Sequence, residues 1–335
     1  MSTSQEILHK AVGQENLSAA EAKTFFTAVM QGDVEPAVLA AFLTALKIKG
    51  ESREEILGAV QAMKAACVQA KLSKDFPFLD TCGTGGDGKN SVNISTLSAL
   101  TLSAIGIKVA KHGNRSVSSL CGSSDLLSEL GYSLEIPTDE AEKRLLEKGF
   151  TFLFAPHWHP AMKHAVPVRK ALAYRTLFNI LGPLSNPLSP SHQVLGVFSA
   201  SLLEDMSYVL EHVGVKHSIV CHSQDGYDEF SIFAPTDYII RKGSAQSREC
   251  FHPEVLHLPS LAEADLACNT RTEAVEKAKQ VLQGEKVAAS YAVALNAGVA
   301  LYLFEKAESI VEGYKMALVE IFSGTLQERV QLSIN

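Results

Sequence analysis

The sequence predicts an α/β fold with a small helical subdomain at the N-terminus and a large domain built on a mainly parallel sheet. Three observations predict this fold. The chain up to about residue 70 carries only helical patterns, and from Phe76 onward short apolar runs alternate with helical ones. A chain of 335 residues is also too long for one small core. We expect the helical subdomain at residues 1–72, joined by part of 156–190, and the α/β domain at 73–335.

Capping signals delimit the N-terminal helices. Ser18-Ala-Ala-Glu21 is a capping box that precedes an apolar helical pattern, and Gly32 ends that pattern. A second helix is expected after Pro36, with Gly50 as its end. The box Ser52-Arg-Glu-Glu55 opens a third helix. These signals predict a helical unit without strands.

Short apolar runs mark the strands of the large domain. The predicted strands are Phe78–Thr81, Ile107–Ala110, Thr151–Phe154, Val194–Phe198 and Ser218–Cys221. The stretch from Pro156 to Asn186 is rich in His, Arg and Pro and shows no clean period, so we expect it to return to the helical subdomain. Small and apolar residues predict a helix over Ala288–Phe304.

The net charge and the cysteines restrict the class of protein. A formal charge of −7 disfavours sequence-independent binding to nucleic acid, which needs clustered Lys and Arg. No apolar run is long enough to cross a bilayer, and no leader or lipidation signal is found. The six cysteines form no CxxC pair, which indicates reduced thiols. We expect a cytoplasmic protein with no nucleic-acid or membrane partner.

A glycine-rich loop follows the first predicted strand. Gly83-Thr-Gly-Gly-Asp-Gly88 matches the dinucleotide-binding pattern G-x-G-x-x-G, but that site needs an acid at the end of the second strand. Here the second strand leads into Lys111-His-Gly-Asn-Arg115. These cations would suit the 2′-phosphate of NADP, yet Asp87 would repel a bare pyrophosphate unless it holds a ribose hydroxyl or works beside a metal. A plain strand-to-helix turn remains the alternative.

The two loops together predict a phosphate site. Asn93-Ile-Ser-Thr96 opens a helix after the glycine loop, and the N-terminus of a helix favours an anion. The second loop adds Lys111, Arg115 and several serines. Because parallel strands end at one edge of the sheet, adjacent strands would place both loops over one crevice. Two donor-rich loops at one crevice indicate a ligand with more than one phosphate.

An acidic pair follows the last predicted strand. Asp228-Glu229 lies in a turn, where carboxylates suit Mg²⁺ beside phosphate oxygens and water. Three other adjacent acidic pairs occur in helical patterns and are typical of solvated surface. A surface turn rich in Asp and Gly is the alternative for this pair as well.

Together these segments resemble the anthranilate phosphoribosyltransferase family of tryptophan biosynthesis. The matching segments, which run in family order across most of the chain, are Asp80-Thr-Cys-Gly-Thr-Gly-Gly-Asp87, Asn93-Ile-Ser-Thr96, Lys111-His-Gly-Asn-Arg-Ser-Val-Ser-Ser119, His159-Pro-Ala-Met162, Arg175-Thr-Leu-Phe-Asn-Ile-Leu-Gly-Pro-Leu-Ser-Asn-Pro187 and Asp228-Glu229. The chain departs from the family at Leu172-Ala-Tyr-Arg-Thr176, where the family often has Leu-Gly before its Arg-Thr. The resemblance implies a fold similar to that of the pyrimidine nucleoside phosphorylases.

The resemblance also implies roles for individual residues. Contacts to phosphoribosyl pyrophosphate are implied for Gly83, Gly86, Asp87, Ser91, Asn93, Ile94, Ser95, Thr96, Lys111, His112, Gly113, Asn114, Arg115, Ser116, Val117, Ser118, Ser119 and Ser123. Contacts to anthranilate are implied for Gly83, Asn114 and Arg169, with Arg169 suited to the carboxylate. Ser95, Asp228 and Glu229 are implied as magnesium ligands. No residue is assigned as a general acid or base, and contact with the acceptor stays open for His112 and His164.

The expected reaction is the Mg²⁺-dependent transfer of the 5-phosphoribosyl group from phosphoribosyl pyrophosphate to the amine of anthranilate. The resemblance implies two Mg²⁺ ions per subunit and a homodimer formed through the helical subdomain. Two alternatives remain open. A pyrimidine nucleoside phosphorylase would use free phosphate and usually has a longer chain, and a non-catalytic nucleic-acid-binding relative would have degraded phosphate loops and a basic surface.

Overall fold

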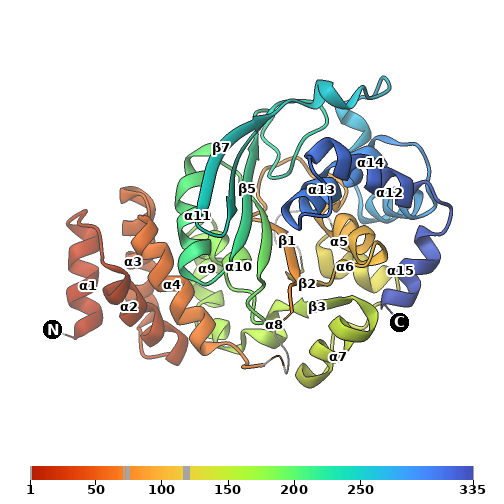
Figure 1. Cartoon of the computed structure of the whole chain (residues 1–335). Coiled ribbons are helices and arrows are strands. Elements are labelled where there is room, and N and C mark those ends of the chain that lie inside the picture. The colour runs from red at the N-terminus through yellow and green to blue at the C-terminus, as the bar shows by residue number, and fades with distance from the viewer. Residues whose placement is uncertain (1, 71, 73–75, 116–120, 335) are drawn as a thin grey trace.

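A helical bundle lies beside a seven-stranded sheet that is covered by helices on both faces (Figure 1). The computed structural model describes residues 2–70, 72, 76–115 and 121–334. The α/β fold with an N-terminal helical unit, predicted from the sequence, is confirmed. No helix in these ranges is both long and apolar enough to span a membrane.

The bundle consists of α1 (Thr3–Val12), α2 (Ala19–Gln31), α3 (Pro36–Lys49) and α4 (Arg53–Ala66). Ser18 and Ser52 form the predicted capping boxes, and Gly32 ends α2 in the left-handed conformation. A further capping box at Ser2 begins α1. Phe25 and Phe42 are fully buried and stack with ring centroids 3.8 Å apart. The bundle therefore has the core that its apolar spacing predicts.

The sheet has the order β3-β2-β1-β4-β5-β6-β7. Its strands are β1 (Leu79–Gly83), β2 (Val109–Gly113), β3 (Phe150–Phe154), β4 (His192–Gly196), β5 (His217–Ser223), β6 (Thr236–Lys242) and β7 (Ala245–Phe251). The first five strands are parallel, whereas β6 and β7 run antiparallel. The five predicted strands are present, with ends shifted by up to three residues. The β6–β7 hairpin was not predicted. β7 is exposed along nearly all its length and so carries no apolar run, whereas the run Tyr238-Ile-Ile240 of the mostly buried β6 was an overlooked strand signal.

Two apolar cores lie on the two faces of the sheet. Ile219 belongs to the core beneath α5 and α13, while its neighbour Val220 belongs to the core that the sheet shares with the bundle. Apart from the short helices between residues 155 and 184, the helices outside the bundle are α5 (Ile94–Ala104), α6 (Ser123–Glu129), α7 (Thr138–Lys148), α11 (Leu203–His212), α12 (Arg271–Leu282), α13 (Ala288–Leu303), α14 (Ile310–Ile321) and α15 (Leu326–Ile334). Short 3-10 turns are η2 (Ala200–Leu202), η3 (Pro253–Leu256) and η4 (Glu263–Asp265).

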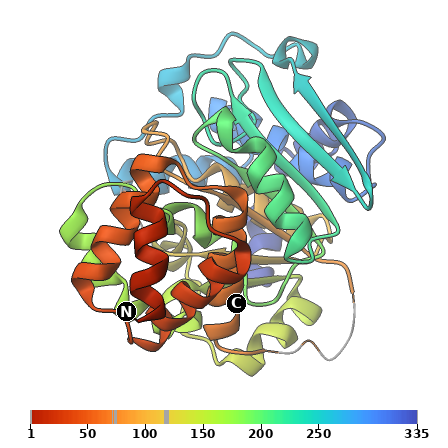
Figure 2. The same cartoon turned by 90° about the vertical axis from the view of Figure 1, so that its left-hand side faces the viewer.

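The stretch without a clean period consists of short helices between the sheet and the bundle. These are α8 (Ala155–Trp158), η1 (Pro160–His164), α9 (Val166–Leu172) and α10 (Phe178–Leu184). η1 contacts α2, α9 contacts α3 and α10 contacts α4. Figure 2 shows the bundle from its outer side, with these short helices beside and behind it. The segment therefore joins the bundle to the edge of the sheet where the parallel strands end.

Candidate active site

The predicted glycine loop and basic loop border one cavity of about 380 Å³. They follow β1 and β2, which are adjacent parallel strands, so their loops leave the same edge of the sheet. The predicted residues that line this cavity are Gly83, Gly86, Asp87, Ser91, Asn93, Ser95, Thr96, Lys111, His112, Gly113, Asn114, Arg115, Ser123, Asp228 and Glu229. We call it the polar cavity. Ser116, Val117, Ser118 and Ser119 lie outside the described residues.

The N-terminus of α5 forms one wall of the polar cavity. Ser95 and Thr96 line the cavity, and Asn93 donates its amide to the carbonyl of Cys121 at 2.9 Å. Ile94, although predicted to contact the ligand, is 2% exposed, has its side chain in the core and donates its backbone N–H to Val92. The N–H groups of the first helical turn have no partners within the helix, so this wall suits an anion.

The second half of the glycine loop is fixed by a distant segment of the chain. Ser91 forms an antiparallel bridge with Ala267. Val92 donates its N–H to Leu266 at 3.0 Å, and Cys268 donates to Asn90 at 2.8 Å. These backbone contacts hold residues 90–92 against η4 and the residues that follow it. The first half of the loop, residues 84–88, makes no such backbone pairing with that segment in the described structure.

The acidic turn reaches the glycine loop by crossing the end of β4. A Cβ on Gly196, the last residue of β4, would lie 1.4 Å from the carbonyl oxygen of Asp228, so only glycine allows this crossing. Asp228 then accepts a hydrogen bond from the N–H of Gly85 at 2.7 Å. A Cβ on Gly83, at the end of β1, would likewise lie 2.3 Å from a carboxylate oxygen of Asp228. Two glycines on separate strands therefore allow an acid that follows β5 to reach the loop that follows β1.

Three carboxylates gather in the polar cavity. Oxygen atoms of Asp87, Asp228 and Glu229 lie within 4.8 Å of one another. Burial raises the pKa of Asp228 to about 6, and the nearby charge of Asp87 acts in the same direction. Burial, followed by the charges of Asp228 and Asp87, raises the pKa of Glu229 well above its ordinary value. Such crowded acids favour a cation, and an all-oxygen set beside a phosphate site suits Mg²⁺.

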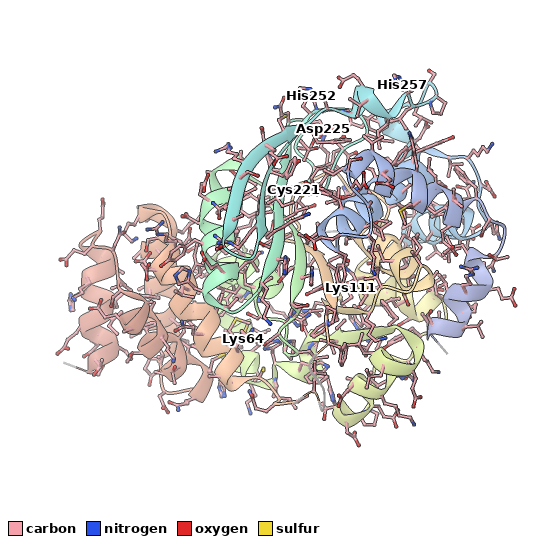
Figure 3. The ribbon with its side chains drawn as sticks, viewed as in Figure 1. Lys64, Lys111, Cys221, Asp225, His252 and His257 are labelled. Carbon is pink, nitrogen blue, oxygen red and sulfur yellow. The ribbon has the colours of Figure 1, made fainter. Side chains whose placement is uncertain are left out.

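Lys111 is the buried cation of the polar cavity. Figure 3 shows it in the interior of the molecule beside β2, and the residue is 2% exposed. Its ammonium group donates to the carbonyl of Thr81 and to the hydroxyl of Ser95, the latter at 3.3 Å. Burial lowers the pKa of Lys111, while the charge of Asp80 opposes that shift. A buried ammonium group at this position gives the cavity a fixed donor for phosphate oxygens.

A second and larger cavity of about 630 Å³ adjoins the polar cavity. We call it the acceptor cavity. Its predicted lining residues are Gly83, Asn114 and Arg169, and it shares Cys82, Gly83, Thr84, His112, Gly113 and Asn114 with the polar cavity. Phe178, Met162 and several prolines supply apolar surface. Burial lowers the pKa of Arg169, whose guanidinium lies 5.4 Å from the centre of the Phe178 ring. The acceptor cavity therefore offers a cation among apolar groups.

Two histidines line the acceptor cavity together. The rings of His112 and His159 have centroids 5.0 Å apart. Burial lowers the pKa of His112 to about 3 and that of His159 to about 4, so both are neutral at pH 7. Within the described chain the Nε2 atom of each ring has no hydrogen-bond partner. His112 therefore lies where an acceptor could contact it.

Two residues considered from the sequence lie elsewhere. His164 packs against Gly32 of the bundle and lines neither cavity. Tyr174 also lines neither cavity, because its hydroxyl lies 2.5 Å from that of Thr44 on α3. Ala173, in the segment where the chain departs from the expected pattern, adopts a φ of 52°, in the left-handed region that favours glycine. Tyr174 therefore adds no aromatic ring to the cavity that Arg169 lines.

Arg175 is a lining residue for which sequence reasoning assigned no role. Its guanidinium donates to the carbonyl of Gly86 and lies 5.0 Å from the centre of the Phe198 ring. It thereby places a further side-chain cation at the polar cavity from the segment between α9 and α10. Arg175 begins one of the segments that resemble the family, but nothing in the sequence indicated a partner for it, since only the fold brings it to Gly86.

Comparisons with known proteins agree with this geometry. A family described as "Glycosyl transferase family, a/b domain" matches residues 75–327, and one described as "Glycosyl transferase family, helical bundle domain" matches residues 5–67. The chain is 41% identical to an anthranilate phosphoribosyltransferase of Methanobrevibacter smithii, over 98% of this chain and 97% of the relative. The solved anthranilate phosphoribosyltransferase of Thermus thermophilus has a TM-score of 0.89 and 39% identity, over 98% and 99% of the two chains.

A third relative carries ligands. The anthranilate phosphoribosyltransferase of Saccharomyces cerevisiae, solved in complex with phosphoribosyl pyrophosphate and Mg, has a TM-score of 0.89 and 25% identity. The match covers 99% of this chain and 97% of the yeast chain.

Proposed function

The chain belongs to the anthranilate phosphoribosyltransferase family, and from that premise we propose how its own residues divide the reaction between the two cavities. The enzyme transfers the 5-phosphoribosyl group from phosphoribosyl pyrophosphate to the amine of anthranilate in tryptophan biosynthesis. The products are N-(5-phosphoribosyl)anthranilate and pyrophosphate. The observation that carries the division is the wall of six residues that the polar and acceptor cavities share.

The polar cavity binds phosphoribosyl pyrophosphate. Its phosphate oxygens meet the N-terminus of α5, the hydroxyls of Ser95 and Thr96, and the cations Lys111 and Arg115. The proposed contacts among the described residues are Gly83, Gly86, Asp87, Ser91, Asn93, Ser95, Thr96, Lys111, His112, Gly113, Asn114, Arg115 and Ser123. Lys111 and Arg115 counter the charge that builds on the departing pyrophosphate, which is an electrostatic contribution to the rate.

Asp228, Glu229 and Ser95 hold magnesium, with Asp87 close enough to contribute. Support comes from the three carboxylates within 4.8 Å and from the burial that makes the charges of Asp228 and Glu229 costly without a cation. Bound Mg²⁺ supplies neutralisation of the pyrophosphate charge as the ribosyl bond breaks. We propose two ions per subunit, because Asp87 and Glu229 provide oxygens beyond those one ion needs when phosphate and water also coordinate it.

The acceptor cavity binds anthranilate. Arg169 pairs with its carboxylate, and Asn114 and Gly83, which lie on the shared wall, place its amine next to the ribosyl carbon. The amine attacks from the face opposite the pyrophosphate, which inverts the configuration at that carbon. An aniline-type nitrogen is unprotonated at neutral pH, so its lone pair forms the new bond without a general base as the bond to pyrophosphate breaks. The surplus N–H proton of the product then passes to water. The neutral rings of His112 and His159 leave the carboxylate to Arg169.

The decisive assay follows anthranilate fluorescence. Fluorescence is expected to fall when the protein, phosphoribosyl pyrophosphate and Mg²⁺ are combined, and to stay constant when a chelator replaces Mg²⁺. Uridine with inorganic phosphate is the control for a nucleoside phosphorylase, and no uracil is expected. Turnover of uridine, or an unchanged anthranilate signal with Mg²⁺ present, would overturn the proposal.

We also propose how the chain is divided and assembled. Residues 1–72 with part of 156–190 form one unit and residues 73–335 the other, which the contacts of η1, α9 and α10 with the bundle support. Exposed apolar side chains on the packed helices α1 and α3, Val12 at 61% and Ile48 at 74%, support a homodimer through the bundle. Light scattering after size exclusion should give twice the 36.1 kDa mass of the chain.

All six cysteines are thiols rather than disulfides, which supports a reducing compartment such as the cytoplasm.

A further inference from the structure

A buried carboxylate that lines neither cavity lies between the elements that form both. Asp80, in β1, is 0% exposed. One of its oxygens accepts the backbone N–H of His112 at 3.3 Å, and the other accepts the amide of Asn186 at 2.9 Å. β1 ends in the glycine loop and β2 ends in the basic loop, so Asp80 connects the strands that carry the two phosphate loops.

Asn186 extends this connection to the acceptor cavity. It follows α10, whose Phe178, Asn179 and Gly182 line that cavity. Its amide nitrogen donates to both Asp80 and the carbonyl of Ala110 on β2, at 2.9 Å each, and its oxygen accepts from the N–H of Leu188 at 3.0 Å. Both N–H groups and the oxygen of this amide are therefore hydrogen-bonded, and the amide cannot rotate without losing a buried hydrogen bond.

His112 receives a second support from the same helix. Its Nδ1 atom lies 3.1 Å from the carbonyl of Gly182, while its backbone is held by Asp80. The charge of Asp80 also opposes the effect of burial on the pKa of Lys111, the residue before His112. A single carboxylate thus stands behind Lys111 in the polar cavity and His112 on the shared wall.

We propose that Asp80 is a positioning residue that sets the polar cavity and the acceptor cavity relative to each other. It acts through the backbone of His112 and through Asn186, and it touches neither substrate. The inference rests on the proposed function, because its effect appears as a change in the use of both substrates. A residue that served only to stabilise the fold would leave both Michaelis constants unchanged.

The test compares Asp80→Asn with the matched control Glu55→Gln. Glu55 is also 0% exposed, accepts the N–H groups of Leu17 at 3.0 Å and Ser52 at 2.8 Å, and pairs with a lysine, but it lies in the bundle and lines neither cavity. Each substitution keeps the shape, removes a charge and leaves an amide NH₂ group facing a donor. Both variants should melt at lower temperature than the wild type.

Only Asp80→Asn should change the kinetics measured below the melting range. We expect KM for phosphoribosyl pyrophosphate and KM for anthranilate each to rise about tenfold, because displacement of both walls weakens contacts to both substrates. For Glu55→Gln both constants should stay within about twofold of the wild type. Unchanged constants in a destabilised Asp80→Asn, or a change in only one of them, would overturn the inference.

A second variant covers the case in which Asp80→Asn does not fold. Asn186→Ala removes the donor to one oxygen of Asp80 and keeps the charge beside Lys111. It should raise both Michaelis constants, by a smaller factor than Asp80→Asn does. If either constant stayed unchanged, that result would count against the inference. Wild-type protein assayed in parallel separates the two proposals, since an inactive wild type would reject the proposed function itself.

Discussion

A buried carboxylate of the bundle and a cluster of one buried and two half-buried carboxylates at the sheet edge are compensated very differently. In the bundle, Glu55 accepts two backbone N–H groups and lies 2.9 Å from the ammonium group of Lys49, whose side chain is 5% exposed. At the edge of the sheet, Asp228 and Glu229 lie beside a third acid, Asp87. None of these three forms an ion pair with a lysine or arginine among the described residues.

The difference distinguishes a group that stabilises the fold from a group that awaits a ligand. A buried charge costs free energy unless a partner compensates it, and Glu55 has its partners within the chain. Burial and mutual repulsion instead raise the pKa values of Asp228 and Glu229. A bound divalent cation would supply the positive charge that Asp87, Asp228 and Glu229 lack in an ion-pair partner.

Removal of the acids at the sheet edge should abolish most of the activity. Asp228→Asn combined with Glu229→Gln should lower kcat/KM about a thousandfold, because the pyrophosphate charge then lacks its counter-ion. The measurement is anthranilate turnover at saturating Mg²⁺. The matched control is Asp139→Asn with Glu140→Gln, an adjacent pair in the first turn of α7 that should leave turnover unchanged. Near wild-type turnover in the first variant would contradict the proposed metal site.

Removal of Lys49 should leave a buried carboxylate of the bundle without an ion-pair partner, as the acids at the sheet edge are. Lys49→Met leaves Glu55 buried without its cation and should lower the free energy of unfolding by about 3 kcal/mol. Urea unfolding monitored by circular dichroism measures this loss. Catalysis per folded molecule should stay the same, because neither residue lines a cavity. A loss below about 0.5 kcal/mol would show that Glu55 is already solvated.

The comparison also predicts a dependence on pH in the absence of metal. The folded pKa of Asp228 is raised to about 6, so its ionisation destabilises the metal-free fold above that pH, and the destabilisation lessens as pH falls from 6 towards the ordinary value of 3.8. With a chelator at about pH 7.5, the Asp228→Asn, Glu229→Gln variant should therefore melt a few degrees above the wild type. The difference should shrink by about pH 5. Melting curves at both pH values measure it, and a constant difference would contradict the role of burial.

The smallest expected effect concerns Arg175. Arg175→Ala removes the donor to the carbonyl of Gly86 and one cation of the polar cavity, so KM for phosphoribosyl pyrophosphate should rise about tenfold while KM for anthranilate changes little. Initial rates with one substrate varied at a time measure both constants. Arg248→Ala on β7, an exposed arginine remote from the cavities, is the control. Equal changes in both constants would assign Arg175 to the shared wall instead.

Local signals were sufficient for most of the fold and for the polar cavity. Capping boxes at Ser18 and Ser52 depend only on neighbouring residues, and the order of strands β1 and β2 follows from parallel packing. In the β6–β7 hairpin, β7 lacked such a signal because it is almost wholly exposed, although the run Tyr238-Ile-Ile240 of β6 offered one. The convergence of Asp228 on the glycine loop depends on how closely two glycines on separate strands let backbone and side chain approach.

Side-chain positions that are set by tertiary packing could not be predicted from the sequence. The roles of Asp80 and Arg175 depend on partners far away in the chain, Asn186 and Gly86. His164 has the residue type of an acceptor contact, yet η1 turns it towards Gly32 of the bundle. Residue type and spacing therefore predicted the loops that share the polar cavity, but not the side chains that reach it or support it from distant segments.

The backbone pairing of Ser91 with Ala267 limits how much of the glycine loop can rearrange when substrate binds and product leaves. Ordering a residue costs about 1–2 kcal/mol of conformational entropy, so a loop anchored from residue 90 onward confines that cost to the few residues before it. Residues 263–268 thus hold the glycine loop in place, although that loop lies far earlier in the chain. We therefore expect substitutions that break this pairing to change turnover, although residues 263–268 line neither cavity.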